Sequence, residues 1–163
     1  GRLAYQKGYD IIIERMSEMK SNLNFNLLIL GSGELENDLK QLVISKGLSD
    51  YVRFIGYRKN VSSYIRYADA LLLSSRYEGF PNIVLEANSL GKPVFSNSCK
   101  GGINEIIING SNGLACDFTN KEDFQNGLHE FLGTKFDESK IVELTSSRYS
   151  IETIIKKYIN FFS

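Results

Sequence analysis

The chain has 163 residues, of which 42% are hydrophobic and 23% are charged, as in an ordinary globular domain with a sizeable core. Nineteen basic and nineteen acidic residues give a formal net charge of zero, so no basic field indicates a nucleic-acid partner. No apolar run approaches the roughly 20 residues of a membrane-spanning helix. His129 is the only histidine, which excludes a histidine-dependent triad and a histidine-rich metal site. Cys99 and Cys116 lack metal-site spacing, and we expect them to be free thiols of a cytosolic protein.

Helical and strand patterns alternate along the chain. In order, they predict a helix over 9–19, a strand over 25–30, a helix over 34–46, a strand over 52–55, a helix over 61–67, a strand over 70–73, a helix over 83–90, a strand over 93–96, a helix from about 103, a strand from about 113, and helices over 121–132, 139–147 and 151–162. This alternation predicts an α/β fold, a Rossmann-like parallel sheet with helices on both faces. Residues 1–163 then form a single domain whose ligand lies at the carboxyl ends of the strands.

The first predicted strand ends in the sequence Gly31-Ser32-Gly33. This loop is similar to the start of a dinucleotide-binding fingerprint, but Glu36 stands where the third glycine belongs. No ribose-binding acid follows the next strand, so we do not expect a nicotinamide or flavin site. The glycines instead allow a tight turn from strand to helix.

The stretch from Arg76 to Glu86 places two glutamates, Glu78 and Glu86, on either side of a loop that becomes a helix. Asn82 is a good N-cap, so the free N–H groups of residues 83–85 are expected to face one hollow, with the positive end of the helix dipole behind them. The amides suit a phosphate and the carboxylates suit neutral hydroxyls, which together match a sugar nucleotide. A capped surface helix with solvated acids explains the same spacing equally well.

The pattern Ser-x-x-Glu-Gly-Phe-Pro-Asn-x-x-Leu-Glu-Ala over 75–87 resembles the signature of retaining glycosyltransferases with the GT-B fold, family 4 (glycosyl transferases group 1). The resemblance covers nearly the whole chain and implies the C-terminal, donor-binding domain of such an enzyme, without its N-terminal acceptor domain. A second family-like block runs over 99–115, where the Gly101-Gly102 loop precedes a helix.

The resemblance implies roles for individual residues. Arg2 and Lys7 match the basic pair that holds the donor's diphosphate, which suits an arginine fork and a lysine point charge. Glu86 would hold the ribose hydroxyls, and Glu78 would contact the donor sugar. The other candidate donor-binding residues are Gly31, Tyr57, Arg58, Phe80, Pro81, Asn82, Ile83 and Val84. Either Tyr57 or Arg58 packs over the base, or both are plain loop residues.

The implied reaction transfers a hexose or N-acetylhexosamine from a nucleotide diphosphate sugar, with retention, to a glycan or lipid-linked acceptor. Arg2, Lys7 and the amides of 82–84 would neutralise the departing diphosphate, so we expect no metal cofactor. One loop glutamate does not establish a double displacement, and we do not interpret Glu78 as a nucleophile. The Gly-Phe-Pro-Asn version of the loop resembles enzymes that use uridine diphosphate sugars. The acceptor is expected to bind through the N-terminal domain, so this chain alone should transfer nothing.

The resemblance also implies a setting: bacterial polysaccharide or lipid-linked oligosaccharide assembly, in the cytoplasm or at the cytoplasmic face of the inner membrane. The helix predicted over 151–162 has a broad apolar face. That face consists of Ile151, Ile154, Ile155, Tyr158, Ile159 and Phe162. Lys156 and Lys157 beside it leave a membrane-surface helix open, but we favour packing against the domain and, in a complete enzyme, against the missing half.

Two alternatives to a transferase remain open at this stage. A GT-B sugar-nucleotide epimerase would also bind a uridine diphosphate sugar, but it would use further acids and a histidine, for which His129 is badly placed. A non-catalytic nucleotide-binding module would keep the Rossmann core without its chemistry. Such a module should have lost some of the four charged residues Arg2, Lys7, Glu78 and Glu86, and all four are present.

Overall fold

The computed structural model describes residues 1–162, without the side chains of Lys157 and Phe162. The elements, in chain order, are η1 (Tyr5–Lys7), α1 (Tyr9–Glu18), η2 (Lys20–Asn22), β1 (Leu27–Leu30), α2 (Glu36–Ser45), β2 (Val52–Gly56), α3 (Val61–Tyr67), β3 (Leu71–Leu73), α4 (Asn82–Ser89), β4 (Val94–Asn97), α5 (Ile103–Ile106), β5 (Gly113–Cys116), α6 (Lys121–Gly133), α7 (Glu138–Tyr149) and α8 (Ile151–Phe162). The predicted order of helices and strands is confirmed, with ends that differ by one or two residues.

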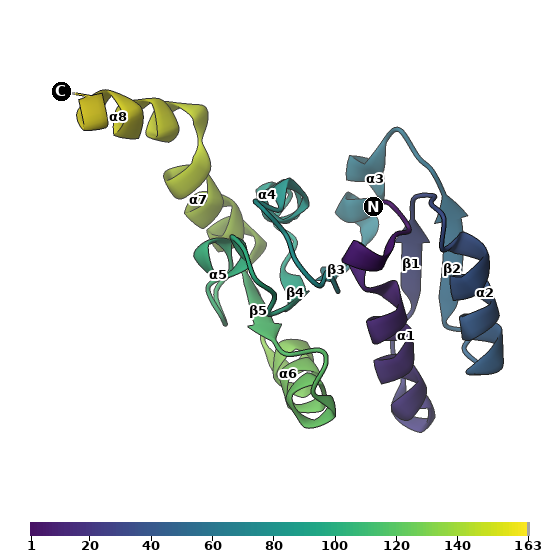
Figure 1. Cartoon of the computed structure of the whole chain (residues 1–163). Coiled ribbons are helices and arrows are strands. Elements are labelled where there is room, and N and C mark those ends of the chain that lie inside the picture. Colours follow the sequence, from purple (N-terminus) through teal and green to yellow (C-terminus); the bar gives the residue numbers. More distant parts are fainter. Residues whose placement is uncertain (163) are drawn as a thin grey trace.

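All strand pairs are parallel, as predicted, but the strands form two sheets instead of one. β1 pairs with β2, and β3, β4 and β5 pair in that order. Within residues 1–162, no backbone ladder joins β1 to β3. The two sheets lie side by side in Figure 1, and α3 carries the chain from one to the other.

Helices cover both faces of the second sheet, because neighbouring residues of β4 point into different apolar clusters. Phe95 belongs to a cluster that includes residues of α1 and α6, whereas Val94 packs with α4 and α5. The first cluster also contains Ile29 of β1, so one core extends under both sheets. Phe118 is fully buried within it, with its ring centroid 4.7 Å from that of Phe95.

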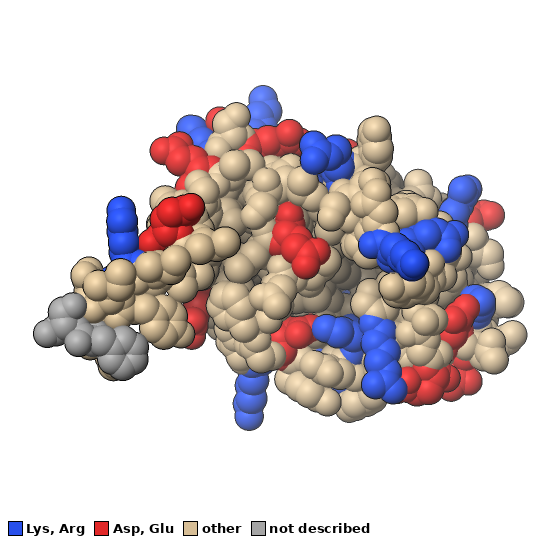
Figure 2. Space-filling view, turned by 90° about the horizontal axis from the view of Figure 1, so that it is seen from above, with Lys and Arg blue, Asp and Glu red and all other residues tan. Residues whose placement is uncertain are grey.

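The face at the top of Figure 1 holds the carboxyl ends of β1 and β2, toward which their arrowheads point. Figure 2 looks down on this face and shows acidic and basic side chains interspersed, as expected from the zero net charge. Ligands of a parallel α/β fold bind at the carboxyl ends of the strands, and the loops that follow β3 and β4 meet there, with Tyr77 paired to Lys100.

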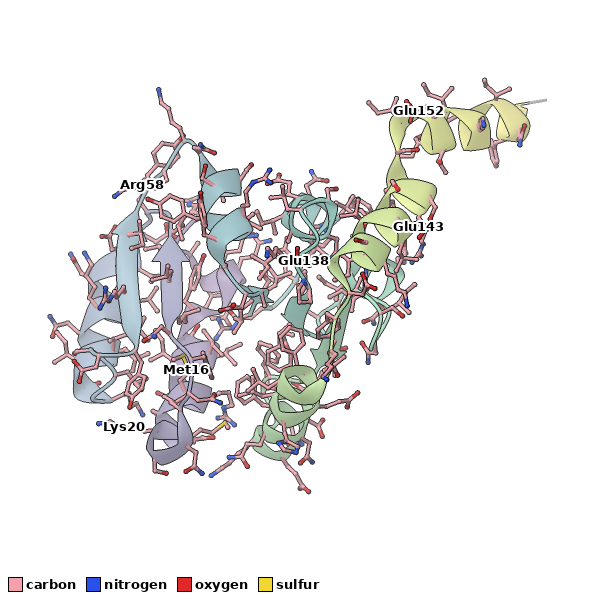
Figure 3. All side chains as sticks on the ribbon, turned by 180° about the vertical axis from the view of Figure 1, so that it is seen from behind. Met16, Lys20, Arg58, Glu138, Glu143 and Glu152 are labelled. Carbon is pink, nitrogen blue, oxygen red and sulfur yellow. The ribbon has the colours of Figure 1, made fainter. Side chains whose placement is uncertain are left out.

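The last helix, α8, projects away from the rest of the molecule (Figures 1 and 3). The prediction that its apolar face packs against the domain is wrong: the exposed fractions of Ile151, Ile154, Ile155, Tyr158 and Ile159 range from 41% to 73%. The extended backbone of Ser150, with φ −64° and ψ 154°, separates α8 from α7 and turns it outward. Phe162 was predicted to lie on this face and Lys157 beside it, but the side chains of both lie outside the described residues.

The two cysteines are free, as the sequence predicted. Cys99 and Cys116 are both free thiols, the first buried and the second half-buried. His129 lies exposed on α6. Burial raises the pKa of the Cys116 thiol to about 12, and the nearby carboxylate of Asp123 adds to this effect. A thiol with so high a pKa is a weak nucleophile at neutral pH.

Candidate functional site

Glu78 lies in the loop between β3 and α4, with its side chain only 9% exposed. Its Oε1 atom accepts hydrogen bonds from Lys7 Nζ and from the Ser75 hydroxyl, each at 2.6 Å. Lys7 comes from η1, 71 residues earlier in the chain. The structure therefore brings two of the predicted site residues, Lys7 and Glu78, into direct contact at the carboxyl end of β3.

The loop of Glu78 is held from the N-terminal side by residues that flank Lys7. The Arg76 N–H donates to the Gln6 carbonyl at 2.8 Å, and the Gln6 side-chain amide donates to the Tyr77 carbonyl at 3.0 Å. The Arg76 guanidinium also forms two hydrogen bonds with the carboxylate of Asp10, in the first turn of α1. These bonds hold the pKa of the Asp10 carboxyl below its ordinary value, even though partial burial opposes the shift.

The loop of Glu78 is held from the other side by the Gly101-Gly102 segment. The Glu78 N–H donates to the Lys100 carbonyl at 3.1 Å, and the Gly102 N–H donates to the Gly79 carbonyl at 2.9 Å. Gly101 has φ 123°, and a Cβ atom there would lie 1.6 Å from the Glu78 carbonyl oxygen. Only glycine fits this close approach, so the segment singled out in the sequence supports the backbone of Glu78.

The pKa values of two neighbouring groups are raised, in part by the charge of Glu78. Burial raises the pKa of the Tyr9 hydroxyl to about 12, and the charge of Glu78 adds to this shift. Burial also raises the pKa of the Cys99 thiol, again with a contribution from Glu78. Tyr9 and Cys99 therefore stay neutral at physiological pH.

The second glutamate, Glu86, lies on α4 and its side chain is exposed. Two details of this helix differ from the prediction. The N-cap residue is Pro81, and Asn82 is the first residue of the helix, with no side-chain cap. The Val84 N–H is not free, because it donates to the Pro81 carbonyl at 2.9 Å. Proline at position 81 shifts the start of the helix, since its ring fixes φ and holds the turn just before Asn82.

The remaining residues of this segment differ in exposure. Pro81 is buried and Ile83 is half-buried, whereas Asn82 is exposed. The Phe80 ring is 48% exposed and lies edge-on to the ring of Tyr149, with centroids 6.1 Å apart. Of these four, Phe80 and Asn82 therefore present the side chains that a ligand can reach.

Of the other predicted residues, Gly31 follows β1, Tyr57 and Arg58 follow β2, and Arg2 lies at the start of the chain, before η1. Arg2 forms an exposed ion pair with Glu34 at 3.3 Å, which draws it toward the loop after Gly31. The Arg58 guanidinium is held by contacts within the protein: its Nε atom donates to the Tyr64 hydroxyl, and its Nη1 atom donates to the Tyr57 carbonyl. Figure 3 shows Arg58 at the end of the molecule toward which β2 runs. The ring of Tyr57 is 66% exposed.

An open hollow of about 800 Å³ lies beside the Glu78 loop. Its walls include Arg76, Cys99 and Lys100, whose backbones flank Glu78, together with Asp117 and Asp123 from the far side. Cations and carboxylates thus line it together. Among residues 1–162, no group of three or more His, Cys, Asp or Glu side chains is arranged to hold a metal ion.

A family model described as glycosyl transferases group 1 matches residues 1–144. This chain belongs to that family. An uncharacterized glycosyltransferase of Haemophilus influenzae is 32% identical over 162 residues, which cover 97% of this chain and 46% of that protein. The amylovoran biosynthesis glycosyltransferase AmsD of Erwinia amylovora is 27% identical over 97% of this chain and 45% of its own length.

Solved glycosyltransferase structures have the same fold as this domain. The apo form of the lipopolysaccharide outer core galactosyltransferase WaaB superposes with a TM-score of 0.84 at 25% identity, covering 98% of this chain and 46% of that one. Anabaena HepE, solved in complex with UDP, superposes with a TM-score of 0.81 at 21% identity, over 99% and 46% of the two chains. The glycosyltransferase domain thus has the fold of one half of a GT-B enzyme and spans about half the length of the curated relatives it matches.

The glycosyltransferase domain also has site residues that the sequence analysis did not single out. Ser75 and Arg76 lie inside the signature stretch, and Ser75 is the first residue of its pattern, but neither was assigned a role from the sequence. Asp10 gave no signal, because an acidic residue in the first turn of a helix is common.

Within residues 1–162, no helix is both long enough and apolar enough to cross a bilayer.

Proposed function

We propose that this domain binds the donor of a retaining glycosyltransferase, which moves a hexose or N-acetylhexosamine from a uridine diphosphate sugar to a glycan or lipid-linked acceptor. The observation that carries the proposal is the contact between Lys7 and Glu78 at the carboxyl end of β3. This contact supports the proposal because a cation suits a diphosphate and a neighbouring carboxylate suits the hydroxyls of the sugar attached to it.

Glu78 is arranged to accept hydrogen bonds from a sugar. Within residues 1–162, both hydrogen bonds to its side chain go to Oε1. Oε2 is therefore available to the hydroxyls of a donor sugar. Lys7 and Ser75 hold the carboxylate in one orientation, and a charged acceptor forms stronger hydrogen bonds than a neutral one. The negative charge of Glu78 would also favour positive charge that develops on the sugar as the diphosphate departs.

Lys7 has three N–H donors, so it can keep Glu78 and still donate to a diphosphate oxygen. Arg2 is exposed and its pair with Glu34 is weak, because both side chains are more than half exposed. It can therefore turn toward the same diphosphate. These two cations and the positive end of the α4 dipole would neutralise the leaving group, so the proposed reaction requires no metal ion.

Glu86 is proposed to hold the ribose. Its exposed carboxylate lies on α4, about one turn beyond the helix start at Asn82. The base would then lie toward the loop after β2, where the exposed ring of Tyr57 offers a surface for stacking. The choice of uridine is supported by the Gly-Phe-Pro-Asn form of the loop and by the UDP bound in HepE.

The acceptor and the product are proposed from the relatives. AmsD is named for amylovoran biosynthesis, and a Rhizobium meliloti relative that is 26% identical is named for lipopolysaccharide core biosynthesis. We therefore propose a bacterial surface glycan as the product. Since the acceptor would bind to another domain of the complete enzyme, the 163 residues alone should bind the donor without transferring its sugar.

Calorimetric titration of the domain with UDP, repeated with GDP, tests this function. We expect heat from UDP and none from GDP. Glu86→Ala should weaken UDP binding about tenfold or more, because a charged hydrogen bond contributes roughly 1.5–3 kcal/mol. Glu143→Ala is the matched control, since Glu143 is an exposed glutamate within α7 (Figure 3). Equal binding of UDP and GDP, or no loss with Glu86→Ala, would contradict the proposed base or the ribose contact.

A further inference from the structure

The side chain of Arg76 is committed to contacts within the protein. Its Nη1 atom donates to Asp10 Oδ1 and to the Tyr5 carbonyl, each at 2.8 Å, and its Nη2 atom donates to Asp10 Oδ2 at 2.5 Å. The guanidinium carbon also lies 4.0 Å from the centroid of the Tyr5 ring. Because Asp10 neutralises its charge and Tyr5 covers its face, Arg76 is poorly placed to bind a phosphate itself.

The two partners of Arg76 bracket the turn that carries Lys7. Tyr5 begins η1, Lys7 ends it, and Asp10 lies in the first turn of α1. Gly8 between them has φ 61°, and a Cβ atom there would lie 2.2 Å from the Ser74 carbonyl oxygen. The Ser74 hydroxyl donates to the Lys7 carbonyl at 2.9 Å. The turn that carries Lys7 thus packs against the end of β3. Arg76 binds the residues on both sides of this turn, Tyr5 and Asp10.

We propose that Arg76 is a positioning residue for the donor's diphosphate: by holding Tyr5 and Asp10, it keeps Lys7 beside Glu78. This inference rests on the proposed function. Arg76 precedes Glu78 by two residues, so one short loop carries both the Glu78 carboxylate and the clamp, which is the set of contacts of Arg76 with Tyr5 and Asp10 that keeps Lys7 beside Glu78. Diphosphate affinity then depends on Arg76 even though Arg76 does not touch the nucleotide.

The arginine fork is what this role requires. A planar guanidinium can bond both carboxylate oxygens of Asp10 and the Tyr5 carbonyl at once while it stacks on a ring. A lysine ammonium in its place is a point charge on a flexible stem and cannot hold the same three groups in one geometry. The Lys7 side chain has its own rotamer freedom, so loss of the clamp would raise the entropic cost of placing its ammonium on a phosphate.

UDP titration of Arg76→Met and Arg76→Lys tests the inference. We expect both variants to bind UDP about tenfold more weakly than the wild type, and Arg76→Lys not to restore affinity. The variant Lys7→Met and the double variant Lys7→Met with Arg76→Met complete a cycle. If Arg76 acts through Lys7, the double variant should bind no more weakly than Lys7→Met alone. A further loss in the double variant would mean that Arg76 contacts the nucleotide, which would overturn the positioning role.

Lys92→Met is the control for general loss of stability. Lys92 forms a comparable long-range ion pair with Glu138 at 2.7 Å, and its side chain is 15% exposed, against 20% for Arg76. The pair joins the loop after α4 to the start of α7. Lys92→Met should therefore lower the melting temperature about as much as Arg76→Met while leaving UDP affinity unchanged.

Amide hydrogen exchange provides a readout that needs no nucleotide. In Arg76→Met, the amides of Lys7 and Gly8 should exchange at least tenfold faster than in the wild type, because they bond within the clamped turn to Ala4 and Tyr5. Lys92→Met should not change them. UDP binding by Arg76→Met at wild-type strength would overturn the inference. If the wild type itself gives no heat with UDP, the proposed function fails, and unchanged exchange in Arg76→Met would overturn the clamp as well.

Discussion

At the scale of residues, the position of Glu78 depends on a serine that sequence reasoning passed over. Ser75 is fully buried and donates its hydroxyl to Glu78 Oε1. Its own carbonyl accepts a hydrogen bond at 2.9 Å from the buried side chain of Asn97 at the end of β4. A hydroxyl held in this way fixes one oxygen of the carboxylate, so the rotamer of Glu78 is set before any ligand arrives.

Ser75→Ala should therefore lower the affinity for a UDP-sugar more than the affinity for UDP. Loss of one hydrogen bond to a charged acceptor costs roughly 1.5 kcal/mol or more, so we expect UDP-glucose to bind about tenfold more weakly. UDP should change less than threefold, because Glu78 is proposed to contact the sugar. Calorimetry with both ligands measures this difference. Ser96→Ala removes another fully buried hydroxyl, bonded to the Asn97 carbonyl, and serves as the control. Equal losses for the two ligands would argue against a sugar contact.

At the scale of elements, α4 is anchored by a pair of buried amides. Asn88, near its end, and Asn112, in the loop before β5, donate side-chain hydrogen bonds to each other's oxygen atoms at 3.1 and 3.0 Å. Asn112 also donates to the Ile106 carbonyl and accepts from the Ile108 N–H. The helix that carries Glu86 is thereby joined to the segment that follows α5, through polar groups that are 2% exposed or less.

Asn112→Ala should destabilise the domain by about 2–4 kcal/mol. The substitution leaves buried partners of Asn112 without hydrogen bonds, and each such group costs roughly 1–3 kcal/mol. Urea unfolding should show a lower midpoint with an unchanged slope. Asn126 is an exposed asparagine on α6, and Asn126→Ala should stay within about 0.5 kcal/mol of the wild type. A loss below 1 kcal/mol for Asn112→Ala would mean that water replaces these bonds.

At the scale of the whole molecule, two separate sheets share one core. The aromatic rings of Phe95, Phe118 and Phe124 pack with centroids 4.7 to 5.7 Å apart. The same apolar cluster contains residues of α1, β1 and α2. Side-chain packing through α1 and α6 therefore joins the two sheets, as backbone hydrogen bonds join the strands within each sheet. The domain should for this reason unfold as one unit.

Phe118→Ala tests this coupling. Truncation of a fully buried phenylalanine costs about 3–5 kcal/mol because it leaves a cavity. We expect a single unfolding transition at a lower denaturant concentration, and faster amide exchange in β1 and β2 as well as in β4 and β5. Tyr67 is 89% exposed, so Tyr67→Ala should leave the midpoint unchanged. Two separate transitions, with β1 and β2 unaffected, would show that the sheets unfold independently.

The sequence by itself determined the order and approximate bounds of the elements, the α/β class and the pairing of two glutamates across one loop. These features are local: apolar periodicity sets helices and strands, and glycine and proline set the turns between them. The family signature over 75–87 is local for the same reason, and it led to Glu78 and Glu86 directly.

Only the tertiary structure decided the features that join distant segments. Lys7 meets Glu78 across 71 residues, and Arg76 meets Asp10 across 66; neither separation leaves a pattern in one sequence. The division into two sheets, the burial of Ser75 and the outward turn of α8 likewise depend on which surfaces meet. An apolar helix face is compatible with several neighbours, so periodicity predicted the face of α8 correctly but not whether this domain covers it.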